Sequence, residues 1–120
     1  MERVRFITHE NKNILFIDLS NCSKEHAFQV LEKSKGIIKE QPKNSVLALA
    51  DINNEHLYIP DLFLALQEFV KHNKPYIKAS AIIASEERLK LFIDTLSYSS
   101  NRKFSVFDDI EKAKDWLVKV

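Results

Sequence analysis

The sequence has very little glycine and cysteine: among its 120 residues there is one of each, Gly36 and Cys22. Loops that bind phosphate need several glycines for close backbone approach, so the chain can build neither a P-loop nor a dinucleotide-binding fingerprint. A single cysteine excludes an intramolecular disulfide and is typical of a reducing compartment. Turns must use other residues, and eight asparagines are available to adopt left-handed backbone conformations.

Long apolar runs and an excess of one charge are also absent. Residues 1–5 lack the apolar core of a signal peptide, and no run approaches the roughly 18 residues that cross a membrane. The formal net charge of +1 provides no strong field to attract nucleic acid or an anionic membrane. We therefore expect a cytoplasmic protein that does not bind nucleic acid.

The chain has the length of one domain. Its 45% hydrophobic and 29% charged residues are ordinary for a globular protein. The sequence contains no internal repeat, low-complexity segment or linker that would mark a boundary. Residues 1–120 are therefore predicted to form a single domain.

Hydrophobic periodicity predicts an α/β fold with the element order β-β-α-β-α-β-α-β-α. Residues 3–9 and 14–19 are predicted strands, and the short polar stretch between them indicates an antiparallel hairpin. The later strands alternate with helices, which is typical of parallel pairing through right-handed crossovers. We expect a mixed five-stranded sheet whose remaining strands lie at 45–52, 79–84 and 104–107.

Capping residues and prolines delimit the predicted helices. The first helix ends near Glu40, and a polar connection at 98–103 follows the third. The residues expected to cap or begin the four helices are Ser20–Ser23, Pro60, Ser85, and Asp108 or Asp109.

Residues 46–52 are predicted to form the central buried strand. Its apolar run is first interrupted by an acid, Asp51, near the carboxyl end. Ligands of open α/β sheets usually bind at the carboxyl ends of the strands. Leu47 and Leu49 alternate with Ala48 and Ala50, so the two faces of this strand differ in bulk. We expect one face to meet helices and the other to be thin or covered by something flat.

Two segments and the element order carry a resemblance to a known family. One segment is the central strand that ends in Asp51, and the other is the tail at 102–117, a strand that runs into an Ala-x-x-Trp-Leu helix. The whole chain resembles the STAS fold of anti-sigma-factor antagonists, and more closely the small bacterial STAS/Sec14-like proteins. That resemblance implies a fold rather than a reaction, because the function of the small proteins is generally unassigned; they have been linked to lipid or apolar ligands and to peripheral membrane association.

The loop after the central strand departs from the antagonists. The antagonists carry a serine there that a partner kinase phosphorylates, whereas residues 51–56 of this chain contain no serine or threonine. Partner switching by phosphorylation of this loop is therefore not expected, even if the fold is the same.

The candidate site lies where the central strand meets the second helix. Polar side chains there are expected to orient a bound group, and aromatic ones to supply apolar contact. The site residues are Asp51, Asn53, Asn54, His56, Tyr58 and Phe63. In the alternative interpretation, Asp51 caps the turn, the amides adopt left-handed backbone, and the apolar residues pack the second helix on the sheet.

Other chemistries are less well supported. Asp18, Asp51 and Ser85 match three positions of a receiver domain, but the required lysine is missing because Lys103 lies at the wrong end of its strand. Cys22 precedes a helix, where a thiol can be activated, although a buried inert cysteine is commoner. No serine lies in a nucleophile-elbow sequence.

Histidine spacing predicts no local metal site. Zinc sites usually show closely spaced ligands. The four histidines have no histidine partner three or four residues away, so a metal site would require convergence in the tertiary structure. They are His9, His26, His56 and His72.

The sequence therefore predicts a non-enzymatic binding or regulatory domain without a cofactor. Its partner is expected to be another protein, which includes a second copy of the chain. The competing prediction is a small-ligand or lipid carrier, which needs a cavity of a few hundred Å³ under the second helix. A degenerate receiver or a small enzyme ranks third.

Overall fold

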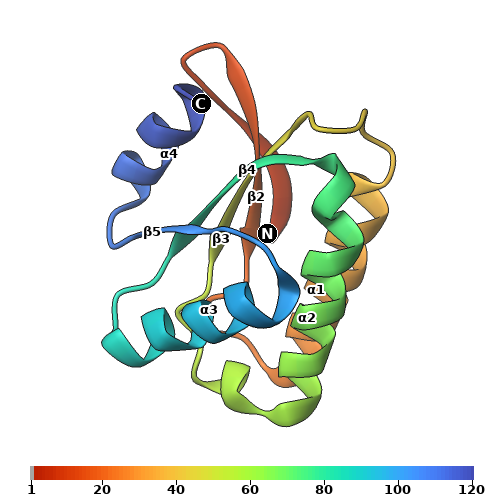
Figure 1. The fold of residues 1–120 in the computed structure, drawn as a ribbon, viewed down its shortest axis with the longest axis vertical. Helices are drawn as coiled ribbons and strands as arrows, with labels where there is room; N and C mark the ends of the chain where they lie inside the picture. Colours follow the sequence, from red (N-terminus) through yellow and green to blue (C-terminus); the bar gives the residue numbers. More distant parts are fainter. Residues whose placement is uncertain (1) are drawn as a thin grey trace.

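A computed structural model of the chain describes residues 2–120. These residues form one five-stranded sheet, four α-helices and two short 3₁₀ helices, in the predicted order (Figure 1). The strands are β1 (Val4–His9), β2 (Lys12–Asp18), β3 (Val46–Asp51), β4 (Ile77–Ile83) and β5 (Ser105–Phe107). The α-helices are α1 (Lys24–Ile38), α2 (Pro60–Asn73), α3 (Glu87–Ser100) and α4 (Ile110–Val118), and the 3₁₀ helices are η1 (Glu55–Tyr58) and η2 (Lys74–Tyr76).

The hairpin of β1 and β2 is antiparallel, as predicted. His9 pairs with Lys12, and the two residues between them have positive φ angles of 48° at Glu10 and 67° at Asn11. Two consecutive left-handed residues match the twist of the strands in a two-residue hairpin turn. Asparagine also takes the left-handed conformation at positions 21, 44 and 101, which confirms that asparagine replaces glycine in the turns.

The other strands are parallel neighbours in sequential order, with β3 in the middle of the sheet. Each new strand is added on the same side of the previous one. Because crossovers of one hand then place their helices on one face, α1, α2 and α3 share a face of the sheet, while α4 lies on the opposite face (Figure 1). We call these the three-helix face and the α4 face.

The two faces of β3 carry side chains of different size, as predicted. Ala48 and Ala50 point toward the three-helix face, and Leu47 and Leu49 toward the α4 face. The expectation that one face would be thin or have a flat cover was wrong, because helices pack on both faces. Alanines leave room for the large helical side chains of the three-helix layer, which include Phe92.

The helix starts agree with the sequence except at α3. Ser23 caps α1 and Asp109 caps α4 through side-chain hydrogen bonds, and Pro60 is the first residue of α2. Ser85 does not cap α3; the N-cap is Glu86, which makes no capping bond through its side chain. Ser85 instead bonds to Asn53.

The carboxyl ends of α1 and α3 lie within three residues of the predicted ends. The connection predicted from residue 98 begins later, since α3 continues to Ser100 and ends at the left-handed Asn101. The first helix stops at Ile38, two residues before the expected end. Within residues 2–120, no helix combines the length and the apolar character needed to cross a membrane.

Candidate functional site

An open groove of about 530 Å³ lies at the carboxyl ends of β2, β3 and β4. Three loops form it: the one that leads into α1, the one that contains η1, and the one that leads into α3. In Figure 1 the ends of β3 and β4 lie toward the bottom of the sheet, where the chain turns into α2 and α3. The lining residues are Asn21, Cys22, Ser23, Asn53, Asn54, Glu55, His56, Ser85, Glu86, Arg88 and Leu89.

Asp51 is at the carboxyl end of β3, but its side chain does not line this groove. Alternation along β3 places Asp51 on the α4 face with Leu47 and Leu49. Its Oδ1 accepts hydrogen bonds from Asn53 N at 3.1 Å and Asn53 Nδ2 at 2.9 Å. The carboxylate therefore caps the turn after β3, as the alternative interpretation of this segment predicts.

The environment of Asp51 disfavours its charged form. Partial burial raises the pKa of the Asp51 carboxyl, and the neighbouring charge of Asp18 acts in the same direction. The two acids are register partners on adjacent parallel strands. The hydrogen bonds from Asn53 oppose this shift but do not cancel it.

Asn53 links β3 to the beginning of α3. Its Oδ1 accepts from Ser85 N at 3.0 Å and from Ser85 Oγ at 2.9 Å, while its Nδ2 donates to Asp51. The amide oxygen thus holds the two loops together, and the amide nitrogen anchors the side chain to the end of β3. This bond also explains why Ser85 does not cap α3, since its hydroxyl is engaged by Asn53.

Asn54 forms part of the floor of the groove and is buried, with 4% of its surface exposed. Its Nδ2 donates to Leu19 O at 2.7 Å and to Cys22 O at 3.1 Å, and its Oδ1 accepts from His56 N at 2.8 Å. The predicted left-handed backbone is wrong here, because φ is −146°. Asn54 therefore fixes the shape of the groove, and its amide is not free to contact a ligand.

Cys22 is not an activated thiol. Its Sγ donates to Leu19 O at 3.6 Å, and partial burial raises the pKa of the thiol. Desolvation outweighs the opposing effect of Arg3, so the environment of Cys22 favours the thiol over the thiolate and agrees with an inert, partly buried cysteine. Cys22 acts as a small, partly buried wall of the groove.

The rim of the groove carries the side chains that are available for contact. The His56 ring is partly exposed, and its nitrogens make no hydrogen bond within residues 2–120. Arg88 pairs with Glu86 at 2.9 Å and lies 5.4 Å above the ring of Tyr58. Tyr58 is 41% exposed, so an exposed arginine–aromatic pair borders the polar groove.

Phe63 is outside the groove. It is partly buried on α2, where its ring meets Phe92 edge-on at 5.3 Å; Tyr58 meets the same ring at 5.7 Å. Phe92 thus joins the two aromatic residues, but only Tyr58 reaches the rim. The role of Phe63 is to pack α2 against α3.

The groove brings together three of the predicted residues with several that sequence reasoning missed. Asn53, Asn54 and His56 line it, Tyr58 borders it, and Asp51 and Phe63 lie elsewhere. The missed contributions are Glu55 and two segments, 21–23 and 85–89, which follow the strands on either side of β3. Neighbouring parallel strands have their carboxyl ends on the same side of a sheet. Applying this rule to the predicted strands would have identified both segments.

The cavity under α2 is small, at about 50 Å³. Its walls are mostly apolar, but three buried polar side chains also line it, Asn73, Ser80 and Arg102. Arg102 donates to Val70 O at 2.6 Å and to Ser80 Oγ at 2.8 Å, whereas Asn73 Oδ1 has no hydrogen-bond partner within residues 2–120. This space can hold one or two water molecules but not a lipid tail.

Comparisons of the chain with protein-family models, with curated proteins and with solved structures found no match. The STAS-like resemblance therefore rests on the residues and the element order described above.

Proposed function

We propose that this chain is a non-enzymatic binding domain that holds a polar segment of a protein partner in the groove at the carboxyl ends of β2, β3 and β4. The observation that carries the proposal is a groove of about 530 Å³ with a fixed polar floor and an exposed Arg88–Tyr58 pair on its rim. Arginine and tyrosine are enriched among the residues that dominate protein–protein binding.

The lining favours a polypeptide over a small apolar ligand. Pockets for small molecules are lined mainly by hydrophobic and aromatic side chains. This groove is lined mainly by amides, hydroxyls, an imidazole and a Glu–Arg pair, with Leu89 and Cys22 as its least polar walls. The groups on the rim, chiefly the His56 imidazole and the Glu86–Arg88 pair, can bond to an extended main chain with polar side chains, while Asn53 and Asn54 fix the floor.

Binding is favoured over catalysis by how these side chains are engaged. Asn53 and Asn54 hold loops, and Cys22 bonds to Leu19 O with a raised thiol pKa. Within residues 2–120, no hydrogen bond joins the His56 ring to a nucleophile or an acid. Nucleophilic catalysis is recognised by a nucleophile and a base within hydrogen-bond reach of each other, and the described residues of the groove show no such pair.

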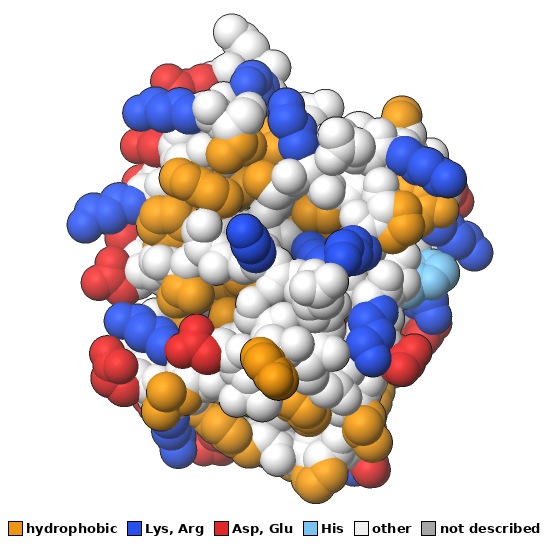
Figure 2. Space-filling model, in the orientation of Figure 1, with side chains coloured by type: hydrophobic (Ala, Val, Ile, Leu, Met, Phe, Trp, Pro, Cys, Tyr) orange, Lys and Arg blue, Asp and Glu red, His pale blue; other side chains and the backbone are white. Residues whose placement is uncertain are grey.

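A lipid carrier is less well supported than a protein-binding domain. The cavity under α2, where a carrier would hold an acyl chain, measures about 50 Å³. Acidic and basic side chains alternate along the left margin of the face in Figure 2, while Lys and Arg predominate across its centre, and the formal net charge of +1 provides no strong overall field for an anionic membrane. The resemblance to the STAS/Sec14-like group, with its links to lipid or apolar ligands, is the feature that supports the carrier.

The test is to select peptides from a displayed random library against the full chain and to measure their affinity for matched variants. We expect Tyr58→Ala and Arg88→Ala each to weaken binding at least about tenfold, because the rim pair would contact the peptide. Tyr98→Ala and Arg5→Ala are the controls, because neither residue lines the groove. Tyr98 is 93% exposed on α3, and the guanidinium of Arg5 lies 5.0 Å from the centre of the Phe16 ring.

Two results would contradict the proposal. One is selection of peptides that bind the rim variants as tightly as the parent protein. The other is binding of a fatty acid or of lipid vesicles with no peptide binding, which would favour the carrier.

A further inference from the structure

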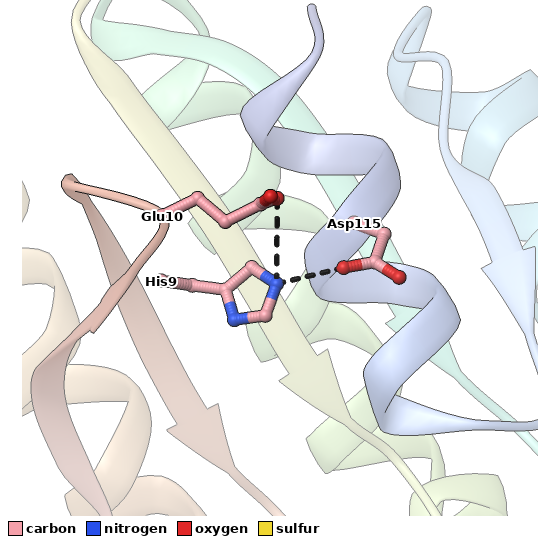
Figure 3. A group of neighbouring side chains, drawn as sticks. All are labelled: His9, Glu10 and Asp115. Atoms are coloured by element: carbon pink, nitrogen blue, oxygen red, sulfur yellow. Dashed lines mark hydrogen bonds and ion pairs between the residues drawn. The ribbon is translucent and has the colours of Figure 1, made fainter.

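A histidine and two carboxylates meet at the end of the sheet opposite to the groove. His9 Nε2 lies 2.7 Å from Asp115 Oδ1 and 3.8 Å from Glu10 Oε2. Figure 3 shows Glu10 and Asp115 directed at the same ring nitrogen from the hairpin turn and from α4. One ligand-type atom from each of the three residues lies within 4.8 Å of the others.

We propose that His9, Glu10 and Asp115 bind a divalent transition-metal ion such as zinc, with water completing the coordination. Imidazole and carboxylate are both zinc ligands, and sites with three protein ligands and one open position are an established type. This ion site is independent of the proposed peptide groove, because the two lie at opposite ends of β2.

The observed geometry requires only small adjustments. Ligand atoms about 2.1 Å from a tetrahedral zinc ion lie about 3.4 Å from one another. The two distances from His9 Nε2, 2.7 Å and 3.8 Å, fall on either side of that value. The side chains of Glu10 and Asp115 are 62% and 56% exposed, so they are free to rotate. Such rotation can bring both carboxylate oxygens to the distances that zinc requires.

The backbone that presents the three ligands is held by other contacts. His9 is paired with Lys12 in the hairpin, and Glu10 occupies the first left-handed position of the turn. Lys12 Nζ donates to Val118 O at 2.7 Å, which ties the end of α4 to the same hairpin. A bound ion would therefore join α4 to the hairpin, although His9 and Asp115 are 106 residues apart.

The test uses full-length protein without a histidine tag and zinc ion alone as the probe. Calorimetric titration should show one ion per chain, and cobalt substitution should give the visible absorption bands of a low-coordinate site. His9→Gln and Asp115→Ala should each weaken binding at least about tenfold, the loss that even outer-shell substitutions cause. His72→Gln, at an exposed histidine on α2, should bind zinc as the parent does.

A second readout separates a site from general destabilisation. Zinc should raise the midpoint of thermal unfolding of the parent protein and of His72→Gln, because an ion that binds the folded state stabilises it. The same shift should be absent in Asp115→Ala, whose fold is checked by circular dichroism. Absence of zinc binding to the parent, or equal binding by His9→Gln and Asp115→Ala, would overturn the proposal.

Discussion

The three-helix face and the α4 face of the sheet differ in how they are filled. β3 presents alanines to the first and leucines to the second. Where three helices pack, most of the bulk comes from the helices, and the strand contributes little. Where α4 packs on β3, Leu47 and Leu49 supply more of the core. This contrast is a feature of β3, since β2 presents Leu15 and Ile17 to the three-helix face and β4 presents Ala79 and Ala81 to the α4 face.

The two faces also differ in where they place polar residues. α1 and α3 begin at the carboxyl ends of the parallel strands, so the loop that leads into α1 and the first turn of α3 line the groove. α4 follows the edge strand β5 and extends to the opposite end, where Asp115 meets His9. Crossovers that all lie on one face therefore place their polar loops at the carboxyl ends of the parallel strands. The last helix, α4, places Asp115 at the opposite end of the sheet.

The largest effect should come from exchanging the sizes of two adjacent β3 residues. Leu49→Ala should lower the free energy of unfolding by about 3 kcal/mol, because Leu49 is fully buried on the α4 face. Ala48→Leu should cost about 2 kcal/mol by overpacking the three-helix face. Urea denaturation of the double variant should show no recovery. If total volume mattered and the face did not, the double variant would be more stable than Leu49→Ala.

A smaller loss is expected at the floor of the groove. Asn54→Ala should lower the free energy of unfolding by about 2 kcal/mol, because the carbonyls of Leu19 and Cys22 lose their buried donor. Asn13→Ala, at an exposed asparagine of the hairpin, is the matched control and should change stability by less than about 0.5 kcal/mol. Equal effects of the two substitutions would show that Asn54 does not hold these loops.

The pH dependence of stability tests the environment of Asp51. Because burial raises its pKa in the folded state, the folded protein binds this proton more tightly than the unfolded chain does. Its contribution is most favourable below the unfolded-state pKa and is lost as the pH rises through the folded-state pKa. The stability of Asp51→Asn relative to the parent should therefore increase from pH 4 to pH 7 in urea titrations. A decrease over this range would mean that the carboxylate is stabilised by the fold.

The smallest effect on stability is expected at the rim. Arg88→Ala should change the free energy of unfolding by less than about 0.5 kcal/mol, because its pair with Glu86 is exposed. The same substitution should weaken binding of a selected peptide. A large loss of stability would show that Arg88 has a structural role, as Asn54 does. The rim and the floor of the groove would then not differ in function.

Most of the fold was predictable because local signals agreed with one another. The caps at Ser23 and Asp109, Pro60 at the start of α2 and the polar hairpin turn all indicated the observed elements. Ser85 was misassigned because a local capping rule competed with a distant partner, Asn53, which lies 32 residues earlier. Such competition is decided by tertiary structure.

The candidate site was predictable only in part. The alternation Leu47, Leu49, Asp51 already indicates that the acid faces away from the three-helix face, so its position outside the groove could have been foreseen. The pairing of His9 with Asp115 could not, because nothing in the local spacing connects a hairpin to a helix more than one hundred residues later.

The most direct test of the groove is backbone amide shift mapping by NMR with a selected peptide added to labelled protein. Binding in the groove predicts shift changes concentrated at residues 21–23, 53–56 and 85–89, the three lining segments. Small changes are expected along β1 and α4. Changes confined to the outer surfaces of α2 and α4, with these three segments unaffected, would contradict the account.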